Sequence, residues 1–421
     1  MFQPLRHCGL DFGTSNSTLA VASGNAAPRL LPLEAGRPTI PSTIFFDFEN
    51  DRTLFGRAAT AEYVSGTDGR MMRSLKSILG SSLAEETVRI KKRTMSYLQI
   101  IGGFVGELKT RAEVDMGETL DSVLLGRPVH YVDDDPVADR HAQDQMERTV
   151  RALGFRHIAF QYEPIAAALD YEQQVAHEEL GLIVDLGGGT SDFSVVRVSP
   201  DRARAADRAG DILATAGVHV GGTDFDRLLS LKKVMPALGY QTPTADGKRP
   251  LPSAPYVDLA TWHRINRLYD PAVLRELRQT EREARDPERV QNMISIISHR
   301  EGHRLAGAVE DAKIALTADA KTRLAFEGEE VELTTPISRP ELANALDGAI
   351  DKIEDTLRMV VAVAGLTADR IDTLILTGGS TQIPAVMQRL RANFPTARFV
   401  ETDAFGSVGL GLALDAARKF G

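Results

Sequence analysis

Residues 185–192 read DLGGGTSD, and residues 10–17 repeat the pattern as LDFGTSNS. In each copy an apolar run ends in an aspartate, Asp11 or Asp185. A turn of glycine, threonine and serine follows, and a second β-rich run comes after the turn. Each copy therefore predicts a strand, a tight hairpin and a second strand.

The chemistry of these two turns suits a phosphate chain. Glycines let backbone N–H groups close on phosphate oxygens, hydroxyl groups add donors, and an aspartate at a strand end can hold a hydrated divalent cation. One such loop would fit an ordinary tight turn equally well. Two copies indicate a duplicated unit that clamps one phosphate chain from both sides.

Length and composition fit a globular protein of roughly two to four domains. The chain has 421 residues, of which 43% are hydrophobic, and its net charge of −9 gives no electrostatic footprint for nucleic acid. The single Cys8 excludes an internal disulfide and fits a reducing compartment. A strand begins too close to the N-terminus for a signal sequence, and no apolar stretch approaches the ~20 residues of a membrane span. We therefore expect a cytoplasmic protein without nucleic-acid or membrane partners.

The first half of the chain alternates strands and helices. The expected strands lie at residues 39–48, 122–132 and 156–160, and the expected helices at residues 58–80, with breaks, and 136–153. Gly154 follows the last of these helices as its C-terminal cap. Pro164 suits a first helical position, which places Glu163 at the corner between a strand and a helix. In an open α/β sheet that corner faces the ligand crevice.

The second half repeats this scheme from residue 181 onward. A third glycine-rich turn at residues 217–226 leads into a helix. A proline-rich surface loop at 236–255, a charged helical block from 258 to about 316, a strand at 370–377, a turn at 378–380 and helices at 383–390 and 406–420 follow.

Two other chemistries find no support in the sequence. The chain has no G-x-x-x-x-G-K-[ST] pattern, so a P-loop is excluded. His299 and His303 flank Glu301, but they do not form the H-E-x-x-H zinc motif and no third ligand is in view. We interpret this segment as a solvent-facing helix.

Six stretches together resemble the ATPase domain of the DnaK-type seventy-kilodalton heat-shock chaperones, within the actin, sugar-kinase and heat-shock ATPase superfamily. They are LDFGTSNS at 10–17, EPIAAA at 163–168, DLGGGTSD at 185–192, GGTDFD at 221–226, EDAK at 310–313 and LTGGSTQIP at 376–384. The resemblance implies an α/β fold of two duplicated ribonuclease-H-like (actin-like ATPase) lobes with a nucleotide cleft between them. Residues 1–178 would form lobe I and residues 179–421 lobe II, with a helical insertion at about 230–318.

The resemblance also implies ATP or ADP and Mg²⁺ as cofactors, with K⁺ as a further candidate, and it assigns roles. Asp11 and Asp185 would hold the hydrated Mg²⁺, with Asp192 close behind. Lys76 would be the catalytic lysine, although a plain surface-helix lysine is an alternative interpretation because the local match is short. Glu163 would act with Asp185 to orient the attacking water. The expected nucleotide-binding residues are Gly13, Thr14, Ser15, Asn16, Gly187, Gly188, Gly189, Thr190, Gly221, Gly222, Glu310, Lys313, Ile314, Gly378, Gly379, Ser380, Gln382 and Asp403.

The chain departs from the family in three places. Ile314 and Gln382 stand where the family has two arginines that sandwich the adenine, which predicts weaker and less base-selective binding. GRPV at 126–129 stands where the family usually has a TVPA-like run, and no β-rich peptide-binding domain follows the last helix. These departures resemble the YegD-type branch. We therefore expect no autonomous peptide-binding domain, while a protein partner or co-chaperone stays open.

Three functions fit these observations. The favoured one is slow, Mg-dependent ATP hydrolysis by a chaperone-type ATPase whose lobe closure signals to a partner. The second is a kinase for a small polyol or carboxylate, although no acceptor pocket is identified in the sequence. The third is an actin-like filament-forming ATPase. ATP turnover with and without acceptors separates the first two.

Overall fold

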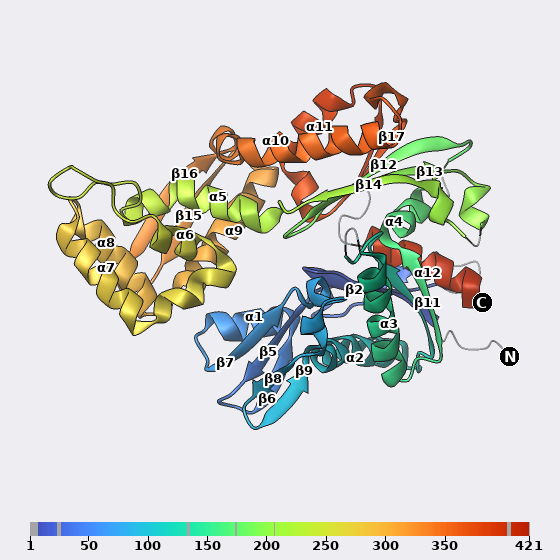
Figure 1. The fold of residues 1–421 in the computed structure, drawn as a ribbon, viewed down its shortest axis with the longest axis horizontal. Coiled ribbons are helices and arrows are strands. Elements are labelled where there is room, and N and C mark those ends of the chain that lie inside the picture. Colours follow the sequence, from blue (N-terminus) through green and yellow to red (C-terminus); the bar gives the residue numbers. More distant parts are fainter. Residues whose placement is uncertain are drawn as a thin grey trace.

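The protein is a mixed α/β molecule built around two sheets, as a computed structural model shows (Figure 1). The structure describes residues 7–22, 27–132, 135–172, 175–205, 207–401 and 406–420. Asp403, one of the predicted nucleotide-binding residues, lies outside these ranges. Within them, no helix combines the length and the apolar character that crossing a membrane requires.

The first sheet has the strand order β11-β10-β1-β2-β3, and β4 also pairs with β2. β1 and β2 form an antiparallel hairpin, whereas β10 and β11 add to β1 in parallel. The strands expected at 122–132 and 156–160 are present with shifted bounds, the segment expected as a strand at 39–48 is divided between this sheet and a smaller one, and β3 is not among the expected strands. The strands of this sheet are β1 (His7–Phe12), β2 (Asn16–Val21), β3 (Arg29–Leu30), β4 (Thr39–Pro41), β10 (Ser122–Arg127) and β11 (His157–Tyr162). The crossover from β10 to β11 is α3 (Pro136–Ala152), whose start Asp135 caps with its side chain.

The second sheet has the order β14-β13-β12-β17-β18. β12 and β13 form the antiparallel hairpin, β17 is parallel to β12, and β18 is parallel to β17. Its strands are β12 (Glu179–Leu186), β13 (Ser191–Val198), β14 (Ile212–Val218), β17 (Thr373–Thr377) and β18 (Arg398–Glu401). The two sheets therefore share one topology. In each, the central strand (β1 or β12) has two antiparallel strands on one side (β2 and β3, or β13 and β14) and two parallel strands on the other (β10 and β11, or β17 and β18).

The hairpins of the two sheets also share their register. Asp11 stands opposite Thr18, and Asp185 stands opposite Asp192, so each hairpin closes over the same number of residues. The hydroxyl of Thr190 donates to the Asp192 carboxylate at 2.9 Å and stiffens the second turn. The two glycine turns therefore have equal lengths and connect equivalent strands of their sheets.

Two helices fill the space between the sheets, namely α4 (Glu163–Glu172) and α12 (Ser407–Phe420) (Figure 1). Side chains from both helices and both sheets form one apolar cluster, which includes Leu124, Ile165, Ile375 and Leu412. The helices approach so closely that a Cβ on Gly411 would lie 1.8 Å from the carbonyl oxygen of Ala166. Only glycine permits this contact, which fixes the start of α4 relative to both sheets.

The chain between β4 and β10 forms a smaller unit against the first sheet. It contains β5 (Thr43–Asp47), β6 (Arg52–Phe55), α1 (Gly56–Val64), β7 (Gly69–Arg73), the short 3₁₀ turns η1 (Leu75–Ile78) and η2 (Ser82–Glu85), β8 (Thr87–Ile90), β9 (Arg93–Ser96) and α2 (Tyr97–Met116). The prediction of a largely helical segment at 58–80 is wrong beyond α1. β7 pairs along β5, and this tertiary pairing overrides the weak local pattern.

The long insertion between β14 and β17 is mostly helical. It contains α5 (Gly222–Lys233), η5 (Met235–Leu238), α6 (Ala254–Ala260), η6 (Trp262–Tyr269), α7 (Pro271–Glu283), α8 (Pro287–Ser298), α9 (Gly302–Ala318), the hairpin β15 (Lys321–Glu327) and β16 (Glu332–Ser338), α10 (Arg339–Val363) and η7 (Ala368–Arg370). Two short turns, η3 (Arg202–Arg204) and η4 (Ala209–Asp211), precede β14, while η8 (Gly379–Gln382) and α11 (Pro384–Asn393) lie between β17 and β18.

The prediction of a solvent-facing helix around His303 is also wrong. Glu301 is 5% exposed and His303 is 4% exposed. Glu301 accepts hydrogen bonds from the backbone N–H of Glu329, and the ring of His303 packs between the rings of Tyr63 and Trp262. These partners are distant in sequence, so the local sequence pattern does not predict that Glu301 and His303 are buried.

Candidate functional site

The two glycine turns lie against each other although they come from different sheets. A Cβ on Gly188 would lie 2.4 Å from the hydroxyl oxygen of Ser15. The second turn is closed by a hydrogen bond from the N–H of Gly187 to the carbonyl of Thr190 at 2.9 Å. The absence of a side chain at Gly188 therefore lets the two loops approach each other closely.

The first turn is held by a residue that the sequence analysis does not identify. The Ser42 hydroxyl donates to the carbonyl of Gly13 at 2.6 Å and lies 2.9 Å from the hydroxyl of Ser17. The backbone N–H of Ser42 donates to the carbonyl of Ser15 at 2.9 Å. A Cβ on Gly13 would lie 2.1 Å from the carbonyl oxygen of Asn16, so this turn needs glycine. Thr14, Ser15 and Asn16 are all half-buried here.

The third glycine turn supports the second one from behind. The N–H of Gly222 donates to the carbonyl of Gly187 at 3.0 Å. The N–H and the hydroxyl of Thr223 both donate to the carbonyl of Gly188, each at 2.8 Å. A Cβ on Gly221 would lie 2.6 Å from the carbonyl carbon of Gly188. The N-terminus of α5 is thereby fixed beside residues 187–190.

The final glycine turn joins the same group of loops. Gly378 has a φ of +82°, and a Cβ there would lie 2.3 Å from the carbonyl oxygen of Leu186 and 2.9 Å from a carboxylate oxygen of Asp185. Ser380 is largely buried, and its hydroxyl would lie 3.0 Å from a Cβ on Gly222. The turn at residues 378–380 thus packs directly on the strand end that carries Asp185.

Lys76 and Glu163 form an ion pair with side chains that are 9% and 20% exposed. Lys76 comes from η1 and Glu163 from the first position of α4. Burial alone would lower the pKa of Lys76, but the carboxylates of Glu163 and Asp11 raise it above its ordinary value. Lys76 is therefore a fixed cation in the interior, and the surface-helix interpretation of this residue is wrong.

Asp11 and Asp185 are buried carboxyl groups whose ionised forms the protein stabilises only in part. Burial raises the pKa of Asp11 to about 7, with Glu163 adding to the rise and Lys76 opposing it. Burial raises the pKa of Asp185 to about 8, and Asp192, Glu163 and Asp11 add to that rise. Carboxylates that raise one another's pKa in this way favour a nearby cation.

These carboxylates suit a hydrated ion better than a closed metal site. Across the described parts of the chain, no group of three or more His, Cys, Asp or Glu side chains is arranged to hold a metal by itself. Mg²⁺ usually keeps several waters and takes one or two carboxylates together with phosphate oxygens. Asp11 and Asp185, beside turns that glycine keeps open, fit that mode.

The predicted nucleoside residues lie on α9 and in the turn after β17. Lys313 is buried, its Nζ lies 2.8 and 2.9 Å from the two carboxylate oxygens of Asp226, and it donates to the carbonyl of Gly222 at 3.2 Å. Burial raises the pKa of Asp226 to about 6, while Lys313 opposes the rise. Glu310 and Gln382 are exposed, and the aliphatic side chain of Ile314 is 54% exposed. Asp226 belongs to the GGTDFD stretch but was not among the predicted site residues.

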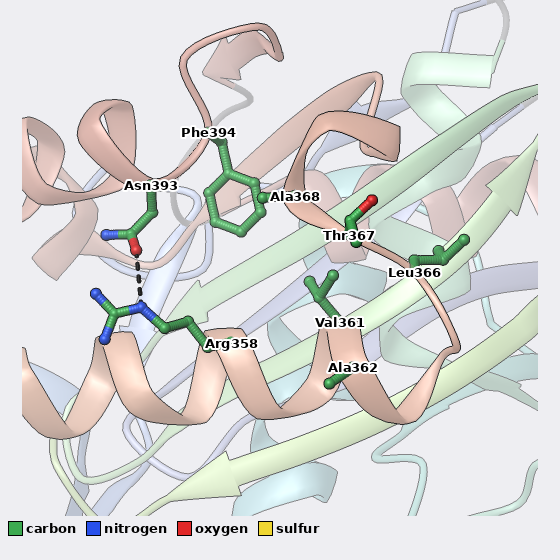
Figure 2. A pocket seen from close by; sticks show the side chains of 8 residues that line it. All are labelled: Arg358, Val361, Ala362, Leu366, Thr367, Ala368, Asn393 and Phe394. Carbon is green, nitrogen blue, oxygen red and sulfur yellow. Dashed lines mark hydrogen bonds between the residues drawn. The ribbon is translucent and has the colours of Figure 1, made fainter.

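Two hollows lie away from these loops and contain none of the predicted site residues. One, of about 180 Å³, is lined by apolar residues of α10 and by Phe394, and at its edge Arg358 donates to Asn393 at 3.1 Å (Figure 2). The other, of about 290 Å³, has Arg127, Arg208 and Lys419 in its wall. Each of these three cations is already paired with a carboxylate.

A comparison with protein families gives a match over most of the chain. The family model described as Hsp70 protein matches residues 7–98, 85–233 and 284–419. These ranges contain Lys76, Glu163 and all four glycine turns.

Proposed function

The chain belongs to the Hsp70 family of chaperone-type ATPases, and on this premise we propose that it binds Mg·ATP or Mg·ADP between residues 11–17 and 185–192 and hydrolyses ATP slowly. The observation that carries the proposal is the close approach of Ser15 and Gly188, which brings two donor-rich turns from different sheets together. Glycine turns of this kind cradle phosphates with their backbone N–H groups. Gly13 to Asn16 would contact the phosphates from one side and Gly187 to Thr190 from the other.

The reaction would depend on charge and position rather than on a covalent step. Phosphoryl transfer is catalysed mainly by aligning the reactants and by neutralising charge on the γ-phosphate oxygens. Lys76 would supply a fixed positive charge there, because its pKa is raised and its side chain is held by Glu163. Glu163 and Asp185 would accept hydrogen bonds from the attacking water and so orient it. Asp11 and Asp185 would hold hydrated Mg²⁺, which polarises the phosphates when it is bound.

We further propose that the two sheets are lobes of one duplicated ATPase, with residues 1–178 in lobe I and residues 179–421 in lobe II. The common strand order, strand directions and hairpin register support this division. The lobes would close on the nucleotide and signal the closed state to a protein partner. α4 and α12 suit this role because they pack between both sheets.

The segment GRPV at 126–129 supports placement in a YegD-like branch of the family. Arg127 takes the place of an apolar residue there and is held in the protein by several contacts. It lies over the rings of Tyr131 and Tyr162, at 5.2 and 5.3 Å, and pairs with Asp139 at 2.7 Å. These contacts hold the Arg127 side chain in place in the segment that precedes β11 and Glu163.

Binding and turnover test the proposal directly. Calorimetry should show binding of ADP and ATP that requires Mg²⁺, and no binding of either nucleotide at millimolar concentration would overturn it. Asp185→Asn should lose both turnover and Mg²⁺ dependence. Phosphate release should be unchanged by a panel of polyols and carboxylates, whereas acceptor-dependent phosphorylation would favour the kinase alternative. Salt- and ATP-dependent sedimentation would favour the filament alternative.

A further inference from the structure

Arg73, at the end of β7, lies over the indole ring of Trp262, with its guanidinium carbon 5.5 Å from the ring centroid. Trp262 begins η6 in the second half of the chain, so the contact joins the unit around β5 and β7 to the helical insertion. The backbone of Arg73 pairs with β5, whereas within the described ranges its side chain makes no hydrogen bond and no ion pair and contacts the indole. The indole is therefore its main direct partner.

Neighbouring contacts show that Arg73 belongs to a wider junction. Tyr63, on α1, lies 3.3 Å from Nε2 of His303 through its hydroxyl, and Asn266 donates to the same hydroxyl. His303 in turn packs edge-on against Trp262, with ring centroids 4.8 Å apart. In Figure 1, α1 faces the yellow helical segment that contains η6. We call Tyr63, Arg73, Trp262, Asn266 and His303 the aromatic junction.

The same stretch of backbone links this junction to Lys76. Ser74 follows Arg73 directly and has a φ of +58°, a left-handed conformation that is strained for a residue other than glycine. Its carbonyl accepts hydrogen bonds from the N–H and the hydroxyl of Ser77, at 3.2 and 2.8 Å. Such strain persists only where surrounding contacts hold the backbone in place. Arg73 on one side and Lys76, paired with Glu163, on the other provide those contacts.

Nearby carboxylates favour the position of the Arg73 guanidinium beside Trp262. Burial lowers the pKa of the Arg73 guanidinium, while Glu310, Asp226 and Tyr63 act in the opposite direction. Glu310 and Asp226 belong to the second half of the chain, at the predicted nucleoside end of the site. Arg73 is thus attracted by two carboxylates of the second half of the chain in addition to its contact with Trp262.

We propose that Arg73 is a positioning residue that couples closure of the two lobes, through Trp262, to the placement of Lys76. The inference rests on the proposed ATPase function. When the aromatic junction is closed, Arg73 is anchored to lobe II, and the short turn that follows holds Lys76 in its catalytic position. When the junction opens, the turn loses one anchor, and Lys76 loses its fixed place beside Glu163.

Single-turnover ATP hydrolysis in four variants tests this coupling. Arg73→Ala and Arg73→Gln should lower the rate by about tenfold, the scale of one partly buried cation–π contact. Arg73→Lys should recover most of the rate because it keeps a cation over the ring. Arg70→Ala, on the same strand, is the matched control and should behave as the wild type. The dissociation constant of Mg·ADP should change by less than about twofold in all four variants. A lower rate with unchanged nucleotide affinity is expected when a substitution affects only the transition state.

Two further measurements separate a positioning role from a merely structural one. If Arg73 acts through Lys76, Arg73→Ala should cost no further rate in a Lys76→Ala background, which a double-mutant cycle measures. Trp262 is the only tryptophan of the chain, so its fluorescence reports the junction without interference. Acrylamide should quench it more readily in Arg73→Ala and Arg73→Gln than in the wild type or Arg70→Ala.

The outcomes are distinguishable. An active wild type with an unaffected Arg73→Ala rate, or additive effects of Arg73→Ala and Lys76→Ala, would overturn this inference alone. A wild type that binds Mg·ADP but never hydrolyses ATP would overturn the proposed hydrolysis and this inference together.

Discussion

Lys76 and Glu163 are joined in an ion pair that bridges η1 and the start of α4, beside the strand end that carries Asp11. The lysine is 9% exposed, and its charge is retained because Glu163 and Asp11 outweigh the effect of burial on its pKa. A buried lysine that keeps its charge is suited to stabilising negative charge on a transferred phosphoryl group. The ion pair with Glu163 also holds the ammonium group of Lys76 in one position.

The first prediction concerns Lys76→Ala. Single-turnover ATP hydrolysis should fall at least ~100-fold, the scale of losing one oriented charge stabiliser. Nucleotide affinity should change less, because the phosphates keep their contacts with the two glycine turns. Lys91→Ala removes an exposed lysine of the same half and is the control. An unchanged rate in Lys76→Ala would show that the ion pair serves stability alone.

The second prediction compares two glycines with positive φ. Gly365 has a φ of +72° with nothing near its missing side chain, so Gly365→Ala should cost only about 1–2 kcal/mol of unfolding free energy. Gly378 has a φ of +82°, and an added Cβ would meet the carbonyl oxygen of Leu186 at 2.3 Å. Gly378→Ala should therefore destabilise the protein more than twice as much in urea denaturation. Equal losses in the two variants would mean that the turn after β17 can move away from β12.

Sequence patterns predict the two hairpins well because their signals are local. Asp11 and Asp185 follow apolar runs, and the glycines that follow them mark the turns. α3 is equally local, since it has Asp135 at its start and Gly154 after its end. The sequence patterns do not reveal which turns touch. The meeting of Ser15 with Gly188 depends on the packing of two sheets around α4 and α12.

The errors in the sequence analysis have a common physical cause. β7 has the sequence GRMMR, which lacks a clear strand pattern and becomes a strand by pairing with β5. His303 looks like part of an exposed charged helix, yet it is buried by Tyr63 from the other half of the chain. Ser42 binds carbonyl groups of the first turn through contacts that no motif describes. In each case the structure depends on a contact with a residue distant in sequence, which the local sequence pattern does not show.

The third prediction concerns the stability of the aromatic junction at low pH. Burial lowers the pKa of His303 from 6.5 to about 4, and Arg73 lowers it too, while the hydrogen bond with the Trp262 carbonyl opposes the shift. The folded protein therefore keeps His303 neutral between these two pH values, whereas the unfolded chain binds a proton there. Because the unfolded state takes up more protons, the free energy of unfolding falls as pH falls through this window.

Between pH 7 and pH 5 His303 should contribute a loss of about 2 kcal/mol. Urea denaturation at both pH values should show this loss in the wild type, and His303→Gln should show correspondingly less. His157→Gln, at an exposed histidine of β11, controls for removing a histidine elsewhere. If His303→Gln and the wild type lose equal stability between the two pH values, His303 is not the group responsible.

The last prediction concerns the base pocket. By the resemblance to the family, Ile314 and Gln382 are expected to take the places of two arginines that sandwich the adenine, and both side chains are exposed. An arginine stacked on an aromatic face contributes roughly 0.5–2 kcal/mol, and each 1.4 kcal/mol is about tenfold in affinity. The wild type should therefore hold nucleotide mainly through its phosphates and Mg²⁺, with fast exchange and poor discrimination between ATP and GTP. The paired change Ile314→Arg with Gln382→Arg should tighten ADP by about tenfold or more in calorimetry. Met359→Arg, which converts an exposed apolar residue of α10, should leave ADP affinity unchanged. A wild-type affinity in the nanomolar range of tight nucleotide binders, with strong ATP preference, would show that other residues hold the base.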